Sequence, residues 1–143
     1  MIKSLLLVDD ESLFHLVFED ACSMLDIALH LESIASADTA EDMFRKWMID
    51  ATRKPECVFV DLNIIGSSID GIELIRRVTQ QYGHGVVIGI ISSSSDSIEQ
   101  QRAQNAGAQF WIVKSDAIEP RLEQFREDYE GYRTNSAPFK VYH

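Results

Sequence analysis

Cysteine, positive charge and long apolar runs are scarce in this sequence of 143 residues, and each shortage excludes a class of protein. The two cysteines, Cys22 and Cys57, are too few for a disulfide framework, and their apolar surroundings predict buried, inert thiols. Only 13 Lys and Arg side chains oppose 23 Asp and Glu side chains, which gives a net charge of −10. Because nucleic-acid phosphates are bound by cationic side chains, direct nucleic-acid binding is not expected.

No apolar run approaches the roughly 20 residues that a membrane-spanning helix needs. The first residues, MIKSLLLVDDES, have acidic side chains where a signal peptide would have a small-residue cleavage site. The sequence therefore predicts a cytoplasmic protein. Its length fits one domain, and its apolar fraction of 45% is enough for an ordinary globular core.

Two kinds of apolar pattern alternate along the chain. Short runs rich in Val, Ile and Leu predict strands at residues 4–8, 30–35, 57–60, 86–91 and 109–113. Segments with helical periodicity lie at residues 12–25, 39–51, 71–82, 97–106 and 118–132. Strands that are apolar on both faces and alternate with helices indicate an α/β fold, with a parallel sheet covered on both sides.

The predicted helix starts support this division. Four Asp-x-x-Glu pairs share one spacing and lie where helices are expected to begin: Asp38 and Glu41, Asp70 and Glu73, Asp96 and Glu99, and Asp116 and Glu119. The Asp of such a pair can cap free backbone N–H groups, and the Glu can reach back to the cap. Gly107 suits a left-handed helix end. Pro120 fits the first turn of the last helix, in which case Asp116 is not its cap.

Polar side chains gather where the predicted strands end. Asp9 and Asp10 follow the first strand, Asp61 follows the third, Ser92 follows the fourth and Lys114 follows the fifth. The carboxyl ends of parallel strands form one edge of the sheet, where α/β proteins bind their ligands. Three carboxylates close together repel one another unless positive charge is present. Oxygen ligands favour Mg²⁺, and a carboxylate beside a metal, a Lys and a hydroxyl suits formation of an aspartyl phosphate.

These segments resemble the receiver domain of two-component response regulators, the CheY-like family. The resemblance rests on LLLVDDE, VFVDL, IDGIEL, IISSSSD and NAGAQFWIVKS, and covers about residues 2–131. The 22-residue separation of Ser92 and Lys114 also agrees with the family pattern. The resemblance implies a doubly wound, flavodoxin-like three-layer sandwich with five parallel strands in the order 2-1-3-4-5. Residues 1–131 would form the receiver domain and residues 132–143 a short tail.

The resemblance also implies a role for each residue at the strand ends. Asp61 would accept the phosphoryl group. Asp10 would bind Mg²⁺ directly, Asp9 would hold it mostly through water, and the backbone carbonyl of Asn63 would be a further ligand. The chain would be a signalling module that accepts a phosphoryl group, not an enzyme.

Two further roles concern switching. Lys114 would pair with the phosphoryl group, and Ser92 would hydrogen-bond it and move on its arrival. Trp111 falls on the position of the family's switch aromatic, although an aromatic residue on a strand is also an ordinary core residue. Because Trp is bulkier than the usual Tyr or Phe, its full rotation toward the interior is expected to be hindered.

The sequence departs from the family pattern at two places beside this site. From Asp61 to Asp70 the chain advances nine positions, two more than in the family's Asp-x-x-x-Pro-x-x-Asp-Gly pattern, and the loop has no proline. Ser115 replaces the proline that usually follows the Lys. A cis bond without proline costs about 3–4 kcal/mol, so a trans or strained bond is expected there.

The expected partners follow from the resemblance. A histidine kinase, a histidine phosphotransfer protein or a small acyl phosphate would supply the phosphoryl group. A downstream protein would bind the face formed by the fourth helix, fifth strand and fifth helix, including Gln100, Arg102, Gln109 and Trp111. A homodimer is a further expectation. The chain is either a single-domain regulator or a fragment of a longer one.

Three other functions are alternatives to this one. One is a degenerate receiver that binds partners without phosphorylation, which the altered loop keeps open. A haloacid dehalogenase-type phosphohydrolase needs a second Asp two positions after the nucleophile, where this chain has Asn63. A flavodoxin-like nucleotide carrier needs a phosphate-binding loop after the first strand, where the chain has three acids.

Overall fold

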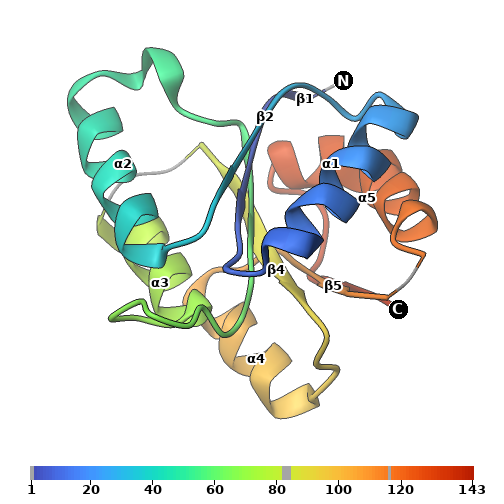
Figure 1. Cartoon of the computed structure of the whole chain (residues 1–143). Coiled ribbons are helices and arrows are strands. Elements are labelled where there is room, and N and C mark those ends of the chain that lie inside the picture. The colour runs from blue at the N-terminus through green and yellow to red at the C-terminus, as the bar shows by residue number, and fades with distance from the viewer. Residues whose placement is uncertain (1, 82–84, 116) are drawn as a thin grey trace.

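Strands and helices alternate along the chain in the computed structural model (Figure 1), which describes residues 2–81, 85–115 and 117–143. The strands are β1 (Ile2–Val8), β2 (Ala28–Ile34), β3 (Cys57–Val60), β4 (Val87–Ser92), β5 (Phe110–Val113) and β6 (Lys140–Tyr142). The helices are α1 (Ser12–Leu25), α2 (Ala37–Ile49), α3 (Gly71–Gln81), α4 (Ser97–Ala106) and α5 (Glu119–Arg133), with a short 3-10 helix η1 (Ala51–Arg53).

All strand pairs are parallel, and the sheet order is β2-β1-β3-β4-β5-β6. The prediction of a parallel α/β sheet is confirmed, but the prediction of five strands is wrong, because β6 adds a sixth beside β5. This strand comes from the segment predicted as a short tail. Without β6, the outer edge of β5 would leave backbone N–H and C=O groups unpaired.

The new strand is fixed to α5 by its last residue. The Tyr142 hydroxyl lies 2.7 Å from the Tyr132 hydroxyl and donates to the Asp128 carboxylate at 2.7 Å. Lys140 also donates to Asp128, at 3.0 Å. Tyr142 is almost fully buried and joins the core next to Phe125. A three-residue strand is short, so these side-chain contacts account for its placement as much as the backbone pairing does.

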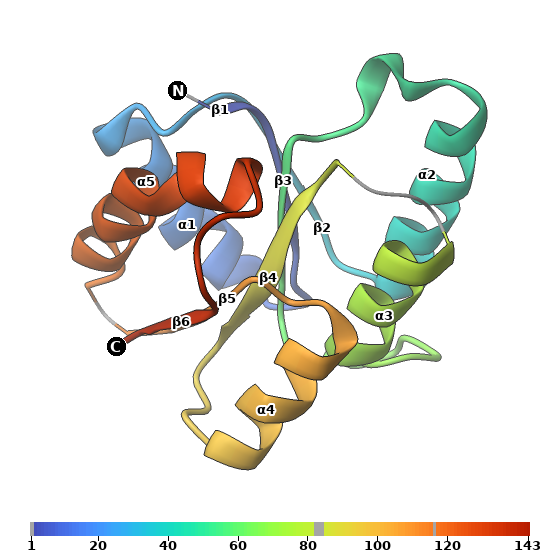
Figure 2. The ribbon, with the colours of Figure 1, turned by 180° about the vertical axis from the view of Figure 1, so that it is seen from behind.

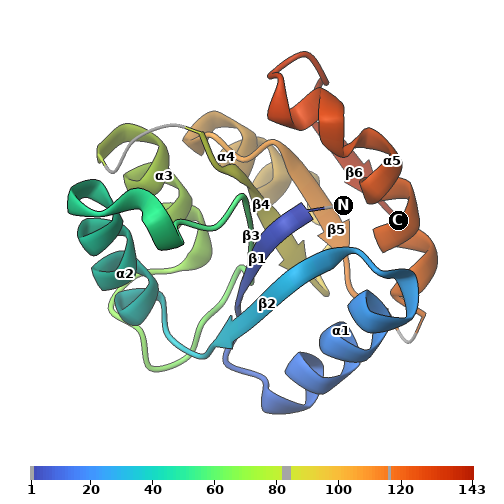
Figure 3. The same cartoon turned by 90° about the horizontal axis from the view of Figure 1, so that it is seen from above.

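The sheet separates two hydrophobic layers. Helices α1 and α5 cover one face and α2, α3 and α4 cover the other, as the view from behind and the view from above show (Figures 2 and 3). The first layer is rich in aromatic rings; Phe59 packs edge-on against Phe18, Phe110 and Phe125 at centroid distances of 5.0–5.3 Å. Cys22 and Cys57 lie in this layer as buried thiols, as predicted.

The helix starts agree with the sequence in part. Asp70 accepts from the Glu73 N–H at 2.8 Å and Asp96 accepts from the Ile98 N–H at 2.9 Å, so both caps are confirmed. The cap predicted at Asp38 is wrong: α2 begins two residues earlier than expected, and Ser36 caps it. The cap at Asp116 lies outside the described residues.

Two Glu residues of the predicted capping boxes, Glu41 and Glu73, bind an arginine of α3. Arg77 binds the buried Glu41 of α2 at 2.9 Å and Glu73 of its own helix at 3.1 Å, so it ties α3 to α2. Gly107 has φ +116° and ends α4 as predicted. Pro120 lies in the first turn of α5. None of the described helices is long and apolar enough to cross a membrane.

Candidate functional site

The polar residues predicted at the strand ends do meet at one edge of the sheet. The Asp61 N–H donates to the Val8 carbonyl at 2.8 Å, and the Lys114 N–H donates to the Ser92 carbonyl at 2.8 Å. These bonds extend the strand ladders by one residue and fix where the side chains start. The lower edge of the sheet in Figure 1 is therefore the candidate site.

Asp61 is a mostly buried carboxylate with a fixed orientation. Its side chain accepts from the Leu62 N–H at 2.8 Å, and the residue is only 8% exposed. Burial and then the nearby Asp9 charge raise the pKa of Asp61 to about 6, although Lys114 acts in the opposite direction. Near neutral pH the Asp61 carboxylate is thus ionised, and its negative charge destabilises the folded protein. An added positive charge would reduce this destabilisation.

Lys114 lies among three carboxylates. Its ammonium nitrogen is 2.7 Å from Asp9 Oδ2 and 3.5 Å from both Asp61 Oδ2 and Glu11 Oε1. It also lies 4.3 Å from the centre of the Phe14 ring. Burial alone would lower the pKa of Lys114, but the hydrogen bond with Asp9 and the charge of Asp61 outweigh it and raise that pKa. Lys114 is therefore the counterion of this edge.

Carboxylate oxygens of Asp9, Glu11 and Asp61 all lie within 4.8 Å of one another, which fits a small divalent cation. Glu11 was not among the predicted ligands; the only signal for it was its place as the third acid in a row. The Asp10 carboxylate turns instead to the Ile65 N–H, from which it accepts at 3.1 Å. Asn63 lies in the exposed β3–α3 loop.

Sequence reasoning also missed two residues of α1 that complete this edge. The Phe14 ring lies under Lys114, and His15 donates from Nε2 to the Asp9 carbonyl. Neither contact has a sequence signal beyond the helical spacing of the residues.

Ser94 connects the two residues predicted to switch. The Ser92 hydroxyl accepts from the Ser94 N–H at 3.1 Å, and the Trp111 indole N–H donates to the Ser94 carbonyl at 3.0 Å. Trp111 is fully buried. The expectation that its bulk hinders an inward position is wrong, because the indole packs in the layer formed with α2, α3 and α4.

A family model, the response regulator receiver domain, matches residues 5–124. The chain belongs to this family. Receiver domains are signalling modules of two-component systems, with histidine kinases upstream and effectors downstream. A search of curated proteins gave no significant match.

Solved structures agree with this assignment. The chain is similar to NtrX from Brucella abortus, with 25% identity, a TM-score of 0.75, and coverage of 94% of this chain but 28% of NtrX. A two-component response regulator from Cytophaga hutchinsonii has 22% identity, a TM-score of 0.76, and coverage of 92% and 96%. The phosphorylated cyanobacterial phytochrome response regulator RcpA has 18% identity, a TM-score of 0.71, and coverage of 96% and 97%. The last two likenesses concern the fold.

Gly71 lets α3 of the receiver domain approach the end of β3. A Cβ at this position would lie 2.0 Å from the Asp61 carbonyl oxygen. Asp70 caps the helix and Gly71 permits the contact, so the Asp-Gly pair has a structural explanation. At the end of β5, the Lys114–Ser115 bond is trans, since the described residues include no cis peptide bond.

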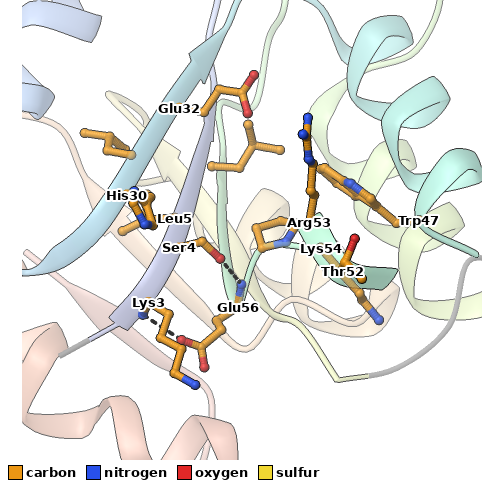
Figure 4. A pocket seen from close by; sticks show the side chains of 13 residues that line it. Lys3, Ser4, Leu5, His30, Glu32, Trp47, Thr52, Arg53, Lys54 and Glu56 are labelled. Atoms are coloured by element: carbon orange, nitrogen blue, oxygen red, sulfur yellow. Dashed lines mark hydrogen bonds between the residues drawn. The ribbon is translucent and has the colours of Figure 1, made fainter. Parts of the chain in front are cut away.

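A separate cavity of about 760 Å³ lies at the other end of β1, near the starts of the strands. Figure 4 shows Trp47 and Arg53 on its α2 and η1 side, facing His30 and Glu32 on β2. The residues that lie at the carboxyl ends of the strands do not line this cavity; they are Asp9, Asp10, Glu11, Asp61, Ser92 and Lys114. The candidate site at the carboxyl ends of the strands is thus separate from this cavity.

Proposed function

We propose that this receiver domain accepts a phosphoryl group on Asp61, with Mg²⁺ bound beside it, and changes its binding to a partner protein as a result. One observation carries the proposal. The Asp61 side chain has one oxygen held by the Leu62 N–H and the other 3.5 Å from the Lys114 ammonium. A carboxylate that is oriented, buried and beside a fixed cation is suited to be a nucleophile.

In the proposed step, an Asp61 carboxylate oxygen attacks the phosphorus of a phosphohistidine or an acyl phosphate. A new O–P bond forms while the P–N or P–O bond of the donor breaks, and the imidazole or carboxylate leaves with the bonding electrons. Lys114 moves from its carboxylate partners toward the phosphoryl oxygens, and the Ser92 hydroxyl donates to one of them.

Mg²⁺, when bound, would neutralise negative charge on the phosphoryl oxygens. The oxygens of Asp9, Glu11 and Asp61 support such a site by their spacing and their chemistry. Direct ligation by Asp10, and by the backbone carbonyl of Asn63, stays a prediction. If Asp10 binds the ion, it must share its carboxylate with the Ile65 N–H.

The proposed donor is the phosphohistidine of a histidine kinase or phosphotransfer protein in the cytoplasm. The start of α1 supports a protein donor, because Leu13 is 72% exposed and Leu16 is 64% exposed close to Phe14, which contacts Lys114. Apolar side chains exposed beside a reactive site favour a protein contact.

The proposed output surface differs from the one expected from the sequence. Trp111 is buried, Gln109 binds the Ile88 N–H and the Tyr132 carbonyl, and β6 runs along β5. The accessible surface on this side is therefore formed by α4, β6 and α5. A downstream protein or a second copy of the chain would bind there, and Arg102 on α4 remains exposed for such a contact.

The test is phosphorylation by acetyl phosphate with Mg²⁺, followed by intact mass. We expect a mass increase of one phosphoryl group in the native protein and none in Asp61→Asn. Asp20→Asn is the matched control, since Asp20 is an exposed acid on α1; it should react like the native chain. No adduct in the native protein would contradict the proposal and favour a receiver that works without phosphorylation.

A further inference from the structure

The β3–α3 loop, residues 62–70, lacks the family's proline and is two residues longer than its pattern. In Figure 1 this loop is drawn in green below the N-terminal end of α2. Ile64 is buried in the layer formed with α2, α3 and α4, and the partly buried Ile69 packs against the same layer. Between them Gly66 has φ +84°, and the Ser67 N–H closes a turn on the Ile64 carbonyl at 3.2 Å. The loop thus has two apolar anchors and a polar tip.

The polar tip is tied to the start of α2. The Ser67 hydroxyl accepts from the Ala37 N–H at 2.9 Å, which satisfies a free donor of the first helical turn. The Ser68 N–H donates to Asp38 Oδ2 at 3.0 Å, and its hydroxyl donates to Asp38 Oδ1 at 2.5 Å. The Ser68 hydroxyl and then its N–H hold the pKa of Asp38 below the usual range. Asp38, predicted to be a helix cap, therefore binds the loop instead.

The same loop is also tied to the acidic edge. The Ile65 N–H donates to Asp10 Oδ2 at 3.1 Å, although the Ile65 side chain is 84% exposed. Asp10 directly follows the buried Asp9, and Asn63 lies two residues before Ile65. The loop therefore connects the start of α2 to Asp10, through the hydrogen bond from Ile65, and to Asn63, through the chain itself. Asp10 and Asn63 are the two predicted ligands outside the cluster of Asp9, Glu11 and Asp61.

We propose that the hydrogen bonds between Ala37 and Ser67 and between Ser68 and Asp38, here called the loop clamp, hold Ile65 in place and so fix the positions of Asp10 and Asn63 beside the cation site. The proposal rests on the proposed function, since the cation is the one that assists phosphorylation of Asp61. A proline would restrict this loop covalently, and without it the loop has more conformations to lose when it presents its ligands. The clamp restricts the loop through hydrogen bonds in place of the missing ring. Asp38 and Ser68 are thus positioning residues for Mg²⁺.

The test measures Mg²⁺ affinity by titration calorimetry. Asp38→Ala and Ser68→Ala should each weaken binding about 3- to 10-fold, as expected for the loss of one or two hydrogen bonds that only the ordered loop makes. Asp42→Ala is the control, because Asp42 lies on the same helix, is exposed, and among the described residues has an ion pair with Arg45 of that helix and no hydrogen bond or ion pair with the loop. It changes the net charge by the same amount as Asp38→Ala and should alter affinity less than about 2-fold.

Two further measurements separate the clamp from a general loss of order. The double variant Asp38→Ala with Ser68→Ala should have the same Mg²⁺ affinity as whichever single variant binds Mg²⁺ more weakly. The reason is that both substitutions disrupt the same contact, between Asp38 and Ser68. Hydrogen exchange without Mg²⁺ should be faster at the Ile65 and Ser68 amides in Asp38→Ala and unchanged in Asp42→Ala.

The outcomes distinguish the two proposals. If native protein binds Mg²⁺ and is phosphorylated, while Asp38→Ala and Ser68→Ala bind Mg²⁺ like Asp42→Ala, the clamp inference is overturned and the proposed function stands. If the native protein does not bind Mg²⁺ at all, both are overturned. Weaker binding confined to the two clamp variants supports the inference.

Discussion

The Lys114 ammonium lies 2.7 Å from Oδ2 of Asp9, and their side chains are only 10% and 0% exposed. Before any phosphoryl group arrives, Lys114 is thus the partner of a fully buried carboxylate. The pair explains how several acidic side chains are tolerated at this edge of the sheet. The Lys114 ammonium partly neutralises Asp9 at close range and Asp61 and Glu11 at a longer distance. Accepting a phosphoryl group requires that this pair be shared or broken.

Replacing Lys114 with Met should destabilise the protein in the absence of divalent cations. The change leaves the Asp9 charge buried without its partner, and breaking one side of a buried pair costs about 3–5 kcal/mol. Urea unfolding in EDTA measures the loss. The double variant Lys114→Met with Asp9→Asn should recover part of it, since the unpaired charge is then gone. A Lys114→Met protein as stable as the native one would show that the pair contributes nothing.

Replacing Asp61 with Asn should stabilise the metal-free protein near pH 7.5. The folded pKa of Asp61 is about 6, above its ordinary value of 3.8, so folding favours the protonated form. The stabilisation from the bound proton is complete below pH 3.8 and is lost as the pH rises through about 6. An Asn side chain does not ionise and so avoids that loss of stability. The difference between the two pKa values corresponds to about 1–3 kcal/mol.

The measurement is denaturant unfolding of both proteins from pH 4.5 to 8 in EDTA. The advantage of Asp61→Asn should shrink as the pH falls below about 6. An Asn variant that is less stable than the native protein at every pH would contradict the burial argument. Asp20→Asn, an exposed change on α1, should show no such pH-dependent gain.

Mg²⁺ binding should weaken in acid for the same reason. The proton and the cation compete for the Asp61 carboxylate, so affinity should fall about tenfold between pH 7.5 and pH 5. Calorimetric titration at the two pH values measures it. Affinity that is equal at both would indicate that Asp61 is not a ligand.

Local patterns in the sequence were sufficient for most of the fold. The helices Ser12–Leu25 and Ser97–Ala106 and the strand Cys57–Val60 have the predicted bounds, because apolar period and end signals are properties of neighbouring residues. The strand-end rule also placed Asp61 and Lys114 at one edge, since parallel strands share a direction.

What the sequence did not predict depends on contacts between distant residues. The strand Lys140–Tyr142 has three residues, too few for a strand pattern, and its place depends on Tyr132 and Asp128 of α5. Asp38 has the spacing of a cap, but it binds Ser68, 30 residues away. Sequence patterns of this kind depend on neighbouring residues, so they do not predict a contact with a residue that is distant in the sequence.

Removing residues 139–143 should expose Trp111. Phe139 and Val141 pack against the layer that contains the indole, and Tyr142 anchors the strand. In a Trp47→Phe background, where Trp111 is the only tryptophan, acrylamide should quench the truncated protein several-fold more strongly than the full chain. Tyr142→Phe, which loses two hydrogen bonds, should lie between them and cost about 1–2 kcal/mol of stability. Equal quenching in all three proteins would show that β6 does not cover Trp111.

The central claim is that Asp61 itself carries the phosphoryl group, and chemical trapping tests it most directly. An acyl phosphate is reduced by borohydride, which converts the modified Asp to homoserine, and peptide mass spectrometry then locates the change. After treatment with acetyl phosphate and Mg²⁺, we predict homoserine at position 61 and at no other acid of the edge. Homoserine at position 9 or 10, hydroxynorvaline (the reduction product of a modified Glu) at position 11, or no reduced residue under conditions that phosphorylate a known receiver domain, would contradict the account.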